Sequence, residues 1–197
     1  FLKLRAPVEG MHAVALRYKM YEKEVRFYTE LAQQMSVRTP KVFYADYDPA
    51  TENIALLLEF MDGWHSPDQI TGASHTQTVA AIKQLANINA PYWNRTQELP
   101  WLPTTQTDYL QQTIGDMQAC RDIFFQRFEN DVPITKADFH QIIEAWPAIL
   151  DGLSEGNLTL THYDYRVENL FFSGDESEVA VIDWQLIAAI RAGWDLA

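Results

Sequence analysis

The stretch His162-Tyr163-Asp164-Tyr165-Arg166-Val167-Glu168-Asn169 organises the rest of this chain. Its informative positions form the pattern H-x-D-x-x-x-x-N. A second apolar run ends in a lone carboxylate, at Val181-Ile182-Asp183-Trp184. Between the two lies a polar, Gly-containing segment, 173–178, flanked by short apolar runs. Because this arrangement is typical of a hairpin, we expect Asn169 and Asp183 to lie at the same hairpin end.

The spacing of these residues is that of a kinase catalytic loop, in which the Asp meets the substrate hydroxyl and the Asn holds Mg²⁺. Oxygen ligands suit this ion, so Asn169 and Asp183 can hold it beside the phosphates of a nucleotide. An isolated match to three positions is weak evidence, and an Asp that closes a strand is also a common turn residue. The two signals in tandem favour phosphoryl transfer over a chance match.

Composition limits the class of protein. The 197 residues, of which 47% are hydrophobic, allow one large domain or two small lobes. The formal net charge of −12 argues against a nucleic-acid partner and mildly favours a cationic or neutral small substrate. The single cysteine, Cys120, excludes an intrachain disulfide. No membrane span or signal peptide is recognisable, so we expect a cytoplasmic protein with no membrane partner.

A buried ion pair is predicted near the start of the chain. Residues 1–4 read as a strand fragment that carries Lys3, and residues 16–34 have the apolar spacing of a helix. Glu24 falls within the apolar stripe of that helix, where a carboxylate is costly to bury unless it is paired. Lys3 is the candidate partner. The alternative is a Glu at the edge of the stripe that reaches solvent.

The segment after this helix predicts a hairpin and then a connector. Strands are expected at 42–45 and 54–60, joined by a turn at 48–53. The second strand is continuously apolar over 54–58, so we expect it to be buried on both faces. It runs into an extended segment that ends at Gly63.

Helices account for most of the sequence between this connector and the catalytic loop. Capping-box patterns begin at Ser74 and at Thr135, each followed by apolar residues at helical spacing. A further helical stretch is expected over 107–128.

These features together resemble the aminoglycoside phosphotransferase family, which belongs with choline kinases to the small-molecule kinases of protein-kinase-like fold. The family's H-G-D-x-x-x-x-N loop is matched at 162–169, and its metal-binding Asp is followed by an aromatic residue, as at Asp183-Trp184. Its G…D-L-A segment is matched at 193–197, and 85–93 is similar to its L-A-x-L-H-A-x-x-W segment. Tyr163 stands where the family usually has Gly, and Asn89 stands where it usually has His.

The resemblance implies an α+β fold of two lobes. Residues 1–61 would form an incomplete, β-rich N-lobe, and residues 62–197 a mostly helical C-lobe that carries the catalytic-loop hairpin. The family's Gly-rich loop would precede Lys3, and further helices would follow Ala197. The resemblance therefore implies a fragment.

The resemblance also implies an ATP- and Mg²⁺-dependent kinase that phosphorylates a hydroxyl of a small acceptor, of the aminoglycoside or choline-like class. Asp164 would be the catalytic base, and Asn169 and Asp183 would hold Mg²⁺. His162 and Asp195 would be structural.

The nucleotide contacts follow from the same resemblance. Lys3 would contact the α- and β-phosphates, and Glu24 would orient Lys3. The connector after the apolar strand would act as a hinge, so that the backbone C=O of Glu59 and the backbone N–H of Met61 meet adenine.

Two other readings remain open at this point. One is a degenerate, nucleotide-binding pseudokinase that acts by interaction, which the bulk of Tyr163 beside the catalytic Asp favours. The other is a metal-dependent hydrolase that uses His162, Asp164 and Asp183. Such sites generally need more His or carboxylate ligands in compact motifs, and the sequence offers none.

Overall fold

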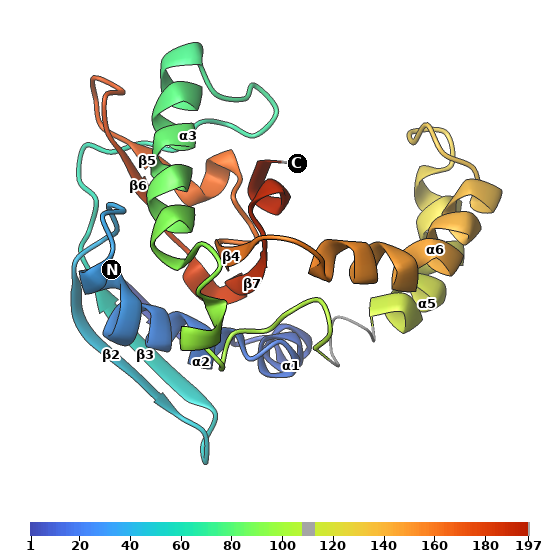
Figure 1. Cartoon of the computed structure of the whole chain (residues 1–197), viewed down its shortest axis with the longest axis horizontal. Coiled ribbons are helices and arrows are strands. Elements are labelled where there is room, and N and C mark those ends of the chain that lie inside the picture. Colours follow the sequence, from blue (N-terminus) through green and yellow to red (C-terminus); the bar gives the residue numbers. More distant parts are fainter. Residues whose placement is uncertain (108–112, 197) are drawn as a thin grey trace. The chain divides into compact units, whose positions relative to one another are not determined.

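The computed structural model describes residues 1–107 and 113–196. The chain forms two compact units, one made of Phe1–Leu102 together with Asn157–Ala197, and the other of Pro103–Gly156. Strands and helices both contribute (Figure 1), which confirms the predicted α+β class. The predicted lobe boundary at 61–62 falls inside the first unit, and the division into lobes stays a prediction.

The N-terminal sheet has three antiparallel strands in the order β1 (Leu2–Leu4), β3 (Asn53–Leu58) and β2 (Val42–Asp48). Side chains of β3 alternate, because Ile54, Leu56 and Leu58 are buried while Leu57 is 43% exposed. Helix α2 (Met20–Arg26) packs on the buried side. The expectation that β3 is buried on both faces is therefore wrong, since an apolar run does not reveal which face is covered.

The helical segment expected over 16–34 begins at Met20 and continues to Gln34, and a separate helix that was not predicted precedes it. Helix α1 (Glu9–Arg17) ends before Lys19, whose φ of 50° is left-handed, and α2 begins in a new direction. The chain then continues through a π-helical turn (Phe27–Leu31) and a 3₁₀ turn (Ala32–Gln34). The break leaves the predicted stripe intact, and Glu24 is buried within it.

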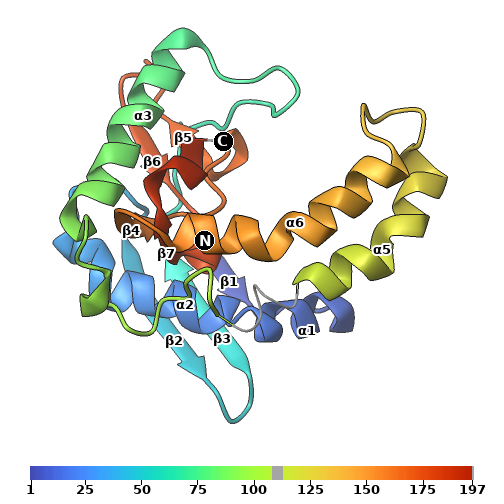
Figure 2. The ribbon, with the colours of Figure 1, turned by 45° about the vertical axis from the view of Figure 1, so that its right-hand side comes forward.

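Helix α3 (His75–Asn89) begins at the predicted capping box, in which the Ser74 and Gln77 side chains each accept the other residue's backbone N–H. Strand β4 (Leu158–Thr161) pairs with β7 (Ala188–Arg191), and β5 (Leu170–Phe172) pairs with β6 (Val179–Val181), both antiparallel. The β5–β6 pair is the hairpin expected between Asn169 and Asp183. Figures 1 and 2 both show α3 beside this hairpin.

The second unit is a pair of helices, α5 (Thr113–Phe128) and α6 (Lys136–Ser154). The rings of Phe124, Phe125, Phe128 and Phe139 join them, with centroids between 5.2 and 6.1 Å apart. Helix α6 begins at the predicted capping box of Thr135. Residues 108–112 of the helix expected over 107–128 lie outside the described residues. No helix in the described part of the chain is long and apolar enough to cross a membrane.

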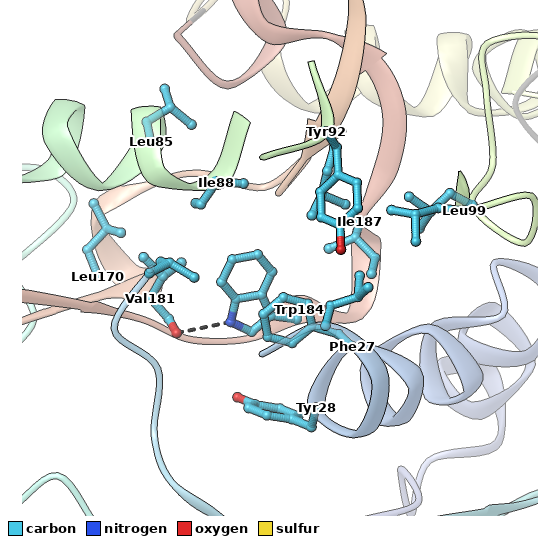
Figure 3. Packing of buried hydrophobic residues seen from close by; sticks show 14 of the residues in the cluster. Phe27, Tyr28, Leu85, Ile88, Tyr92, Leu99, Leu170, Val181, Trp184 and Ile187 are labelled. Atoms are coloured by element: carbon cyan, nitrogen blue, oxygen red, sulfur yellow. Dashed lines mark hydrogen bonds between the residues drawn. The ribbon is translucent and has the colours of Figure 1, made fainter. Parts of the chain in front are cut away.

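Trp184 occupies the centre of the buried core of the first unit (Figure 3). Its ring is fully buried and lies flat against Phe27, with centroids 3.7 Å apart and an interplanar angle of 6°. The indole N–H donates to the Val181 carbonyl at 3.0 Å. Ile88 of α3 and Leu170 of β5 belong to the same cluster. The core thus joins the turn after α2, helix α3 and the hairpin.

We expect Trp184→Ala to lower the free energy of unfolding by about 3–5 kcal/mol, because it removes a fully buried aromatic side chain and leaves a cavity. Trp93→Ala is the matched control, since Trp93 is 45% exposed and its loss should be much smaller. Urea unfolding followed by circular dichroism measures both. Equal losses would contradict the central place of Trp184.

Candidate active site

A cavity of about 490 Å³ opens between the N-terminal sheet and the β5–β6 hairpin. Five of the predicted site residues line it: Lys3, Glu24, Glu59, Met61 and Asp183. The other residues of its walls are apolar or aromatic. Mostly apolar walls with a few charged groups are typical of a small-molecule site.

Lys3 stands between two carboxylates in this cavity. Its Nζ lies 2.7 Å from Glu24 Oε2 and 2.8 Å from Asp183 Oδ1. Glu24 is only 1% exposed, so a charged partner is needed to offset the cost of removing its carboxylate from water. The ion pair predicted between Lys3 and Glu24 is observed, while its role toward phosphates stays a prediction.

Burial and neighbouring charges shift the pKa values of Glu24 and Lys3. Burial raises the pKa of Glu24 to about 7, although the Lys3 ammonium opposes this shift. Burial alone would lower the pKa of Lys3, but Glu24 and Asp183 raise it above its ordinary value. Lys3 is therefore held in its charged form, which a phosphate-binding group requires.

Local structure explains why these side chains meet. Glu24 and Phe27 are three residues apart on consecutive helical turns, so they share a face. Phe27 stacks on Trp184, and Asp183 precedes Trp184 in a left-handed conformation with a φ of 62°, which Asp tolerates. Lys3 pairs in register with the buried Leu56, so it points to the covered face of the sheet.

The segment after β3 carries Glu59 and Met61. The backbone N–H of Glu59 donates to the Lys41 carbonyl, and its carboxylate accepts from the Lys41 N–H at 2.9 Å and from Arg38 Nη2 at 3.0 Å. The Lys41 N–H, assisted by Arg38, lowers the pKa of the Glu59 carboxyl. These bonds hold the segment against the start of β2. The adenine contacts expected of the Glu59 C=O and the Met61 N–H stay predictions.

Asp164 and Asn169 are bonded to each other across the loop. Asn169 Nδ2 donates to the Asp164 backbone carbonyl at 2.9 Å and to Asp164 Oδ2 at 3.0 Å. The Asp164 side chain is 32% exposed, so its carboxylate is accessible to a small molecule. The Ile182 N–H donates to the Asn169 carbonyl, which places Asn169 and Asp183 at the same hairpin end, as expected.

The donor atoms at this hairpin end fit Mg²⁺. Asp183 already faces a cation, the Lys3 ammonium. The amide nitrogen of Asn169 is engaged by Asp164, so its Oδ1 is the atom left to face a metal ion. Mg²⁺ usually takes one or two protein carboxylates or amides and completes its shell with substrate phosphates and water.

The hydrolase alternative needs a denser set of ligands. Within residues 1–107 and 113–196, no three His, Cys, Asp or Glu side chains converge so as to hold a metal ion. His162 is fully buried, and its Nε2 lies 2.9 Å from the Ile182 carbonyl. Burial also lowers the pKa of His162, so it is held neutral as a packing residue. This part of the chain therefore lacks the cluster that a metal-dependent hydrolase requires.

Asp195 fixes the beginning of the catalytic loop. Its carboxylate accepts the backbone N–H of His162 at 2.8 Å and that of Tyr163 at 2.7 Å. Burial raises the pKa of Asp195 to about 6, although both N–H groups oppose this shift. This geometry agrees with the bracing role expected for Asp195.

Tyr163 adopts a left-handed backbone conformation with a φ of 73°. Glycine is favoured in that region because a Cβ atom is strained there. This explains why the resembled motif usually has Gly at this position. Here the Tyr163 ring stacks on Trp194, with centroids 4.9 Å apart, and Trp194 Nε1 donates to the Tyr163 carbonyl at 3.3 Å. These contacts and the bond to Asp195 offset the strain.

Two residues that the sequence analysis did not identify contact the predicted acidic residues Asp164 and Asp183. Arg166 Nε lies 3.4 Å from Asp164 Oδ1, and Gln185 Nε2 donates to Asp183 Oδ2 at 3.2 Å. Each lies two residues after the acid it contacts. That spacing is visible in the sequence, but it brings side chains together only in these particular turn conformations.

Asn89, which stands where the resembled family usually has His, plays a structural part. Its side-chain Nδ2 donates to the Leu160 carbonyl at 2.9 Å, and its backbone carbonyl accepts from the Thr159 hydroxyl. These two hydrogen bonds therefore connect the end of α3 to β4.

The Lys3–Glu24 pair, the Asp164–Asn169 pair and Asp183 are the residues expected of a phosphotransferase of kinase type. Residues 15–197 match the Phosphotransferase enzyme family, and the chain belongs to this family. A comparison with curated proteins gives no match.

Two solved structures are similar to the chain at 12% identity. The gentamicin complex of APH(2")-IIa aligns with a TM-score of 0.47, over 98% of this chain and 62% of that chain. The streptomycin–ATP ternary complex of APH(2")-IIa aligns with a TM-score of 0.43, over 93% of this chain and 59% of that chain. The chain therefore spans less than two thirds of the length of these structures.

We expect Tyr163→Gly to be more stable than Tyr163→Ala by about 1 kcal/mol, because both lose the stacking but only Ala keeps the left-handed strain. Tyr165 provides the control, since its backbone is not left-handed and Ala should there be the better replacement. Urea midpoints of the four variants test this order. The same order at both positions would contradict the strained conformation of Tyr163.

Proposed function

We propose that the chain belongs to an ATP-dependent small-molecule kinase, which transfers the γ-phosphoryl group to a hydroxyl of a small acceptor. The observation that carries this proposal is the convergence of Lys3, Glu24 and Asp183 at one cavity. The Asp164–Asn169 pair extends this set from the same hairpin end. Membership of the phosphotransferase family supports the reaction class.

The cavity offers a consistent place for the nucleotide. Adenine would lie along the segment after β3, accepting from the Met61 N–H and donating to the Glu59 carbonyl. The Lys3 ammonium, held charged by its two carboxylates, would bind the α- and β-phosphates. Asn169 and Asp183 would hold Mg²⁺, which neutralises charge that develops on the phosphates.

Asp164 would act on the acceptor. Its accessible carboxylate accepts the hydroxyl proton and holds that oxygen in line with the γ-phosphorus. The acceptor oxygen then bonds to the γ-phosphorus, and the bond to the β–γ bridging oxygen breaks. The products are the phosphorylated acceptor and ADP, and Asp164 later returns the proton to water.

The acceptor is proposed to be neutral or cationic. The chain has 27 acidic against 15 basic residues, and such an excess favours cationic molecules over anionic ones. An aminoglycoside or choline-like amine with a free hydroxyl satisfies this requirement.

A nucleotide-binding pseudokinase is the alternative, and the strained Tyr163 next to Asp164 is the observation that favours it. The two functions differ in turnover. Magnesium-dependent ATP binding by the full natural chain, without ADP release in the presence of any hydroxyl compound tested, would select the pseudokinase.

In the full natural chain, Asp164→Asn should lower kcat by about 10²–10⁴-fold while ATP affinity changes little, because the amide keeps the shape but loses the basicity. An acceptor is first found by a screen of hydroxyl compounds coupled to ADP release. Asp131→Asn, at an exposed position, is the control for the same chemical change. Wild-type turnover by Asp164→Asn would exclude this residue as the base.

Replacement of the predicted metal ligand Asp183 should affect the dependence of turnover on Mg²⁺. Asp183→Ala is expected to abolish Mg²⁺-dependent ATP turnover and to leave the fold intact, because Asp183 is partly exposed and its neighbour Trp184 still fills the core. Turnover measured against Mg²⁺ concentration, together with thermal unfolding, tests this. A variant that keeps the Mg²⁺ dependence of the wild type would overturn the metal assignment.

A further inference from the structure

Arg166 lies within the catalytic loop, and its guanidinium reaches the proposed base. Its Nε is 3.4 Å from Asp164 Oδ1, and its Nη1 is 2.9 Å from Glu168 Oε2. Nη1 also donates to Gln69 Oε1 at 3.2 Å. The Arg166 N–H donates to the Asp164 carbonyl, so the backbone turns tightly and brings the two side chains together. The side chain is 49% exposed, so a ligand can reach it.

A cation beside Asp164 would offset the carboxylates of the proposed site. Lys3 is the ammonium between Glu24 and Asp183, so carboxylates outnumber cations there. Asp164 adds a further negative charge where the γ-phosphoryl group must arrive. A carboxylate that accepts the hydroxyl proton also repels the oxygens of that group. Arg166 is the cation that contacts Asp164.

An arginine suits the binding of phosphate oxygens beside a carboxylate better than a lysine would. The guanidinium stays charged at any working pH and presents five N–H donors in a planar fork that matches phosphate oxygens. Glu168 and Gln69 hold Nη1, which restricts the side chain without using all of its donors. A pairing with Glu168 alone would be an ordinary surface ion pair of little consequence. The additional contact with Asp164 distinguishes this arginine.

We propose that Arg166 is a catalytic residue that binds the transferred phosphoryl group. Its N–H groups donate to the non-bridging oxygens of that group and stabilise the charge that they carry in the transition state. In the free protein the same guanidinium restrains the Asp164 carboxylate. This role rests on the proposed kinase function, but it is independent of the identity of the acceptor.

Binding of a phosphoryl-transfer analogue tests the proposal without an acceptor. Calorimetric titration of the full natural chain compares Mg²⁺–ADP with Mg²⁺–ADP plus aluminium fluoride, whose fluoride complex imitates the group in transfer. Arg166→Met should weaken the aluminium fluoride complex by about 10- to 100-fold, the usual worth of a hydrogen bond to a charged group, and leave Mg²⁺–ADP binding unchanged. Arg166→Lys, which keeps the charge without the fork, should give an intermediate loss.

Arg95→Met is the matched control, because Arg95 forms an exposed two-bond pair with Glu98, whereas Arg166 contacts Asp164. It should bind both ligands as the wild type does. Thermal unfolding of each variant identifies any loss of fold, and Arg166→Lys then serves as the test if Arg166→Met does not fold.

The possible outcomes distinguish a failure of the proposed function from a failure of the role of Arg166. A wild-type chain that binds no Mg²⁺–ADP would overturn the proposed function itself. A wild-type preference for the aluminium fluoride complex that Arg166→Met fully retains would overturn only the role of Arg166. Equal weakening of both ligands by Arg166→Met would also overturn it, since the residue would then act through the structure of the site.

Discussion

The stacking of Trp184 on Phe27 is the contact on which the candidate site depends. Each ring belongs to a segment that carries a site carboxylate, since Glu24 lies one helical turn before Phe27, and Asp183 directly precedes Trp184. Burying these rings therefore brings two carboxylates to one cavity. Like charges at close range repel, and Lys3 between them converts that repulsion into two ion pairs. The apolar core thus determines where the two carboxylates lie.

A second constraint acts at the catalytic loop. The chain passes through a left-handed conformation at Tyr163, which costs about 1–2 kcal/mol for a residue with a side chain. The Asp195 carboxylate accepts the two successive N–H groups of His162 and Tyr163 at this point of the loop. Because Asp195 is buried, its raised pKa indicates that the loop is held at some electrostatic cost. Backbone strain and desolvation of a carboxylate thus both occur directly before Asp164 in the loop.

Sequence patterns that involve only neighbouring residues predicted the local structure correctly. The capping boxes at Ser74 and Thr135 depend on side chains that reach the backbone only three residues away, so a four-residue pattern is enough to predict them. The break at Lys19 was missed because nothing in its side chain demands a left-handed conformation. The one-sided burial of β3 was missed for another reason, since burial depends on what α2 covers. Likewise, the contact between Arg166 and Asp164 follows from a loop conformation that neither residue specifies alone.

The charge of the cavity has a consequence for its ligand. Lys3 is shared by Glu24 and Asp183, so two carboxylates of the described lining face a single ammonium. A nucleotide triphosphate is itself a polyanion, and its phosphates would be repelled from such a surface if they arrived alone. A divalent cation that accompanies the phosphates removes this conflict, because the same carboxylates then become favourable partners. The distribution of carboxylates would thus favour a nucleotide that arrives together with a divalent cation over one that arrives alone.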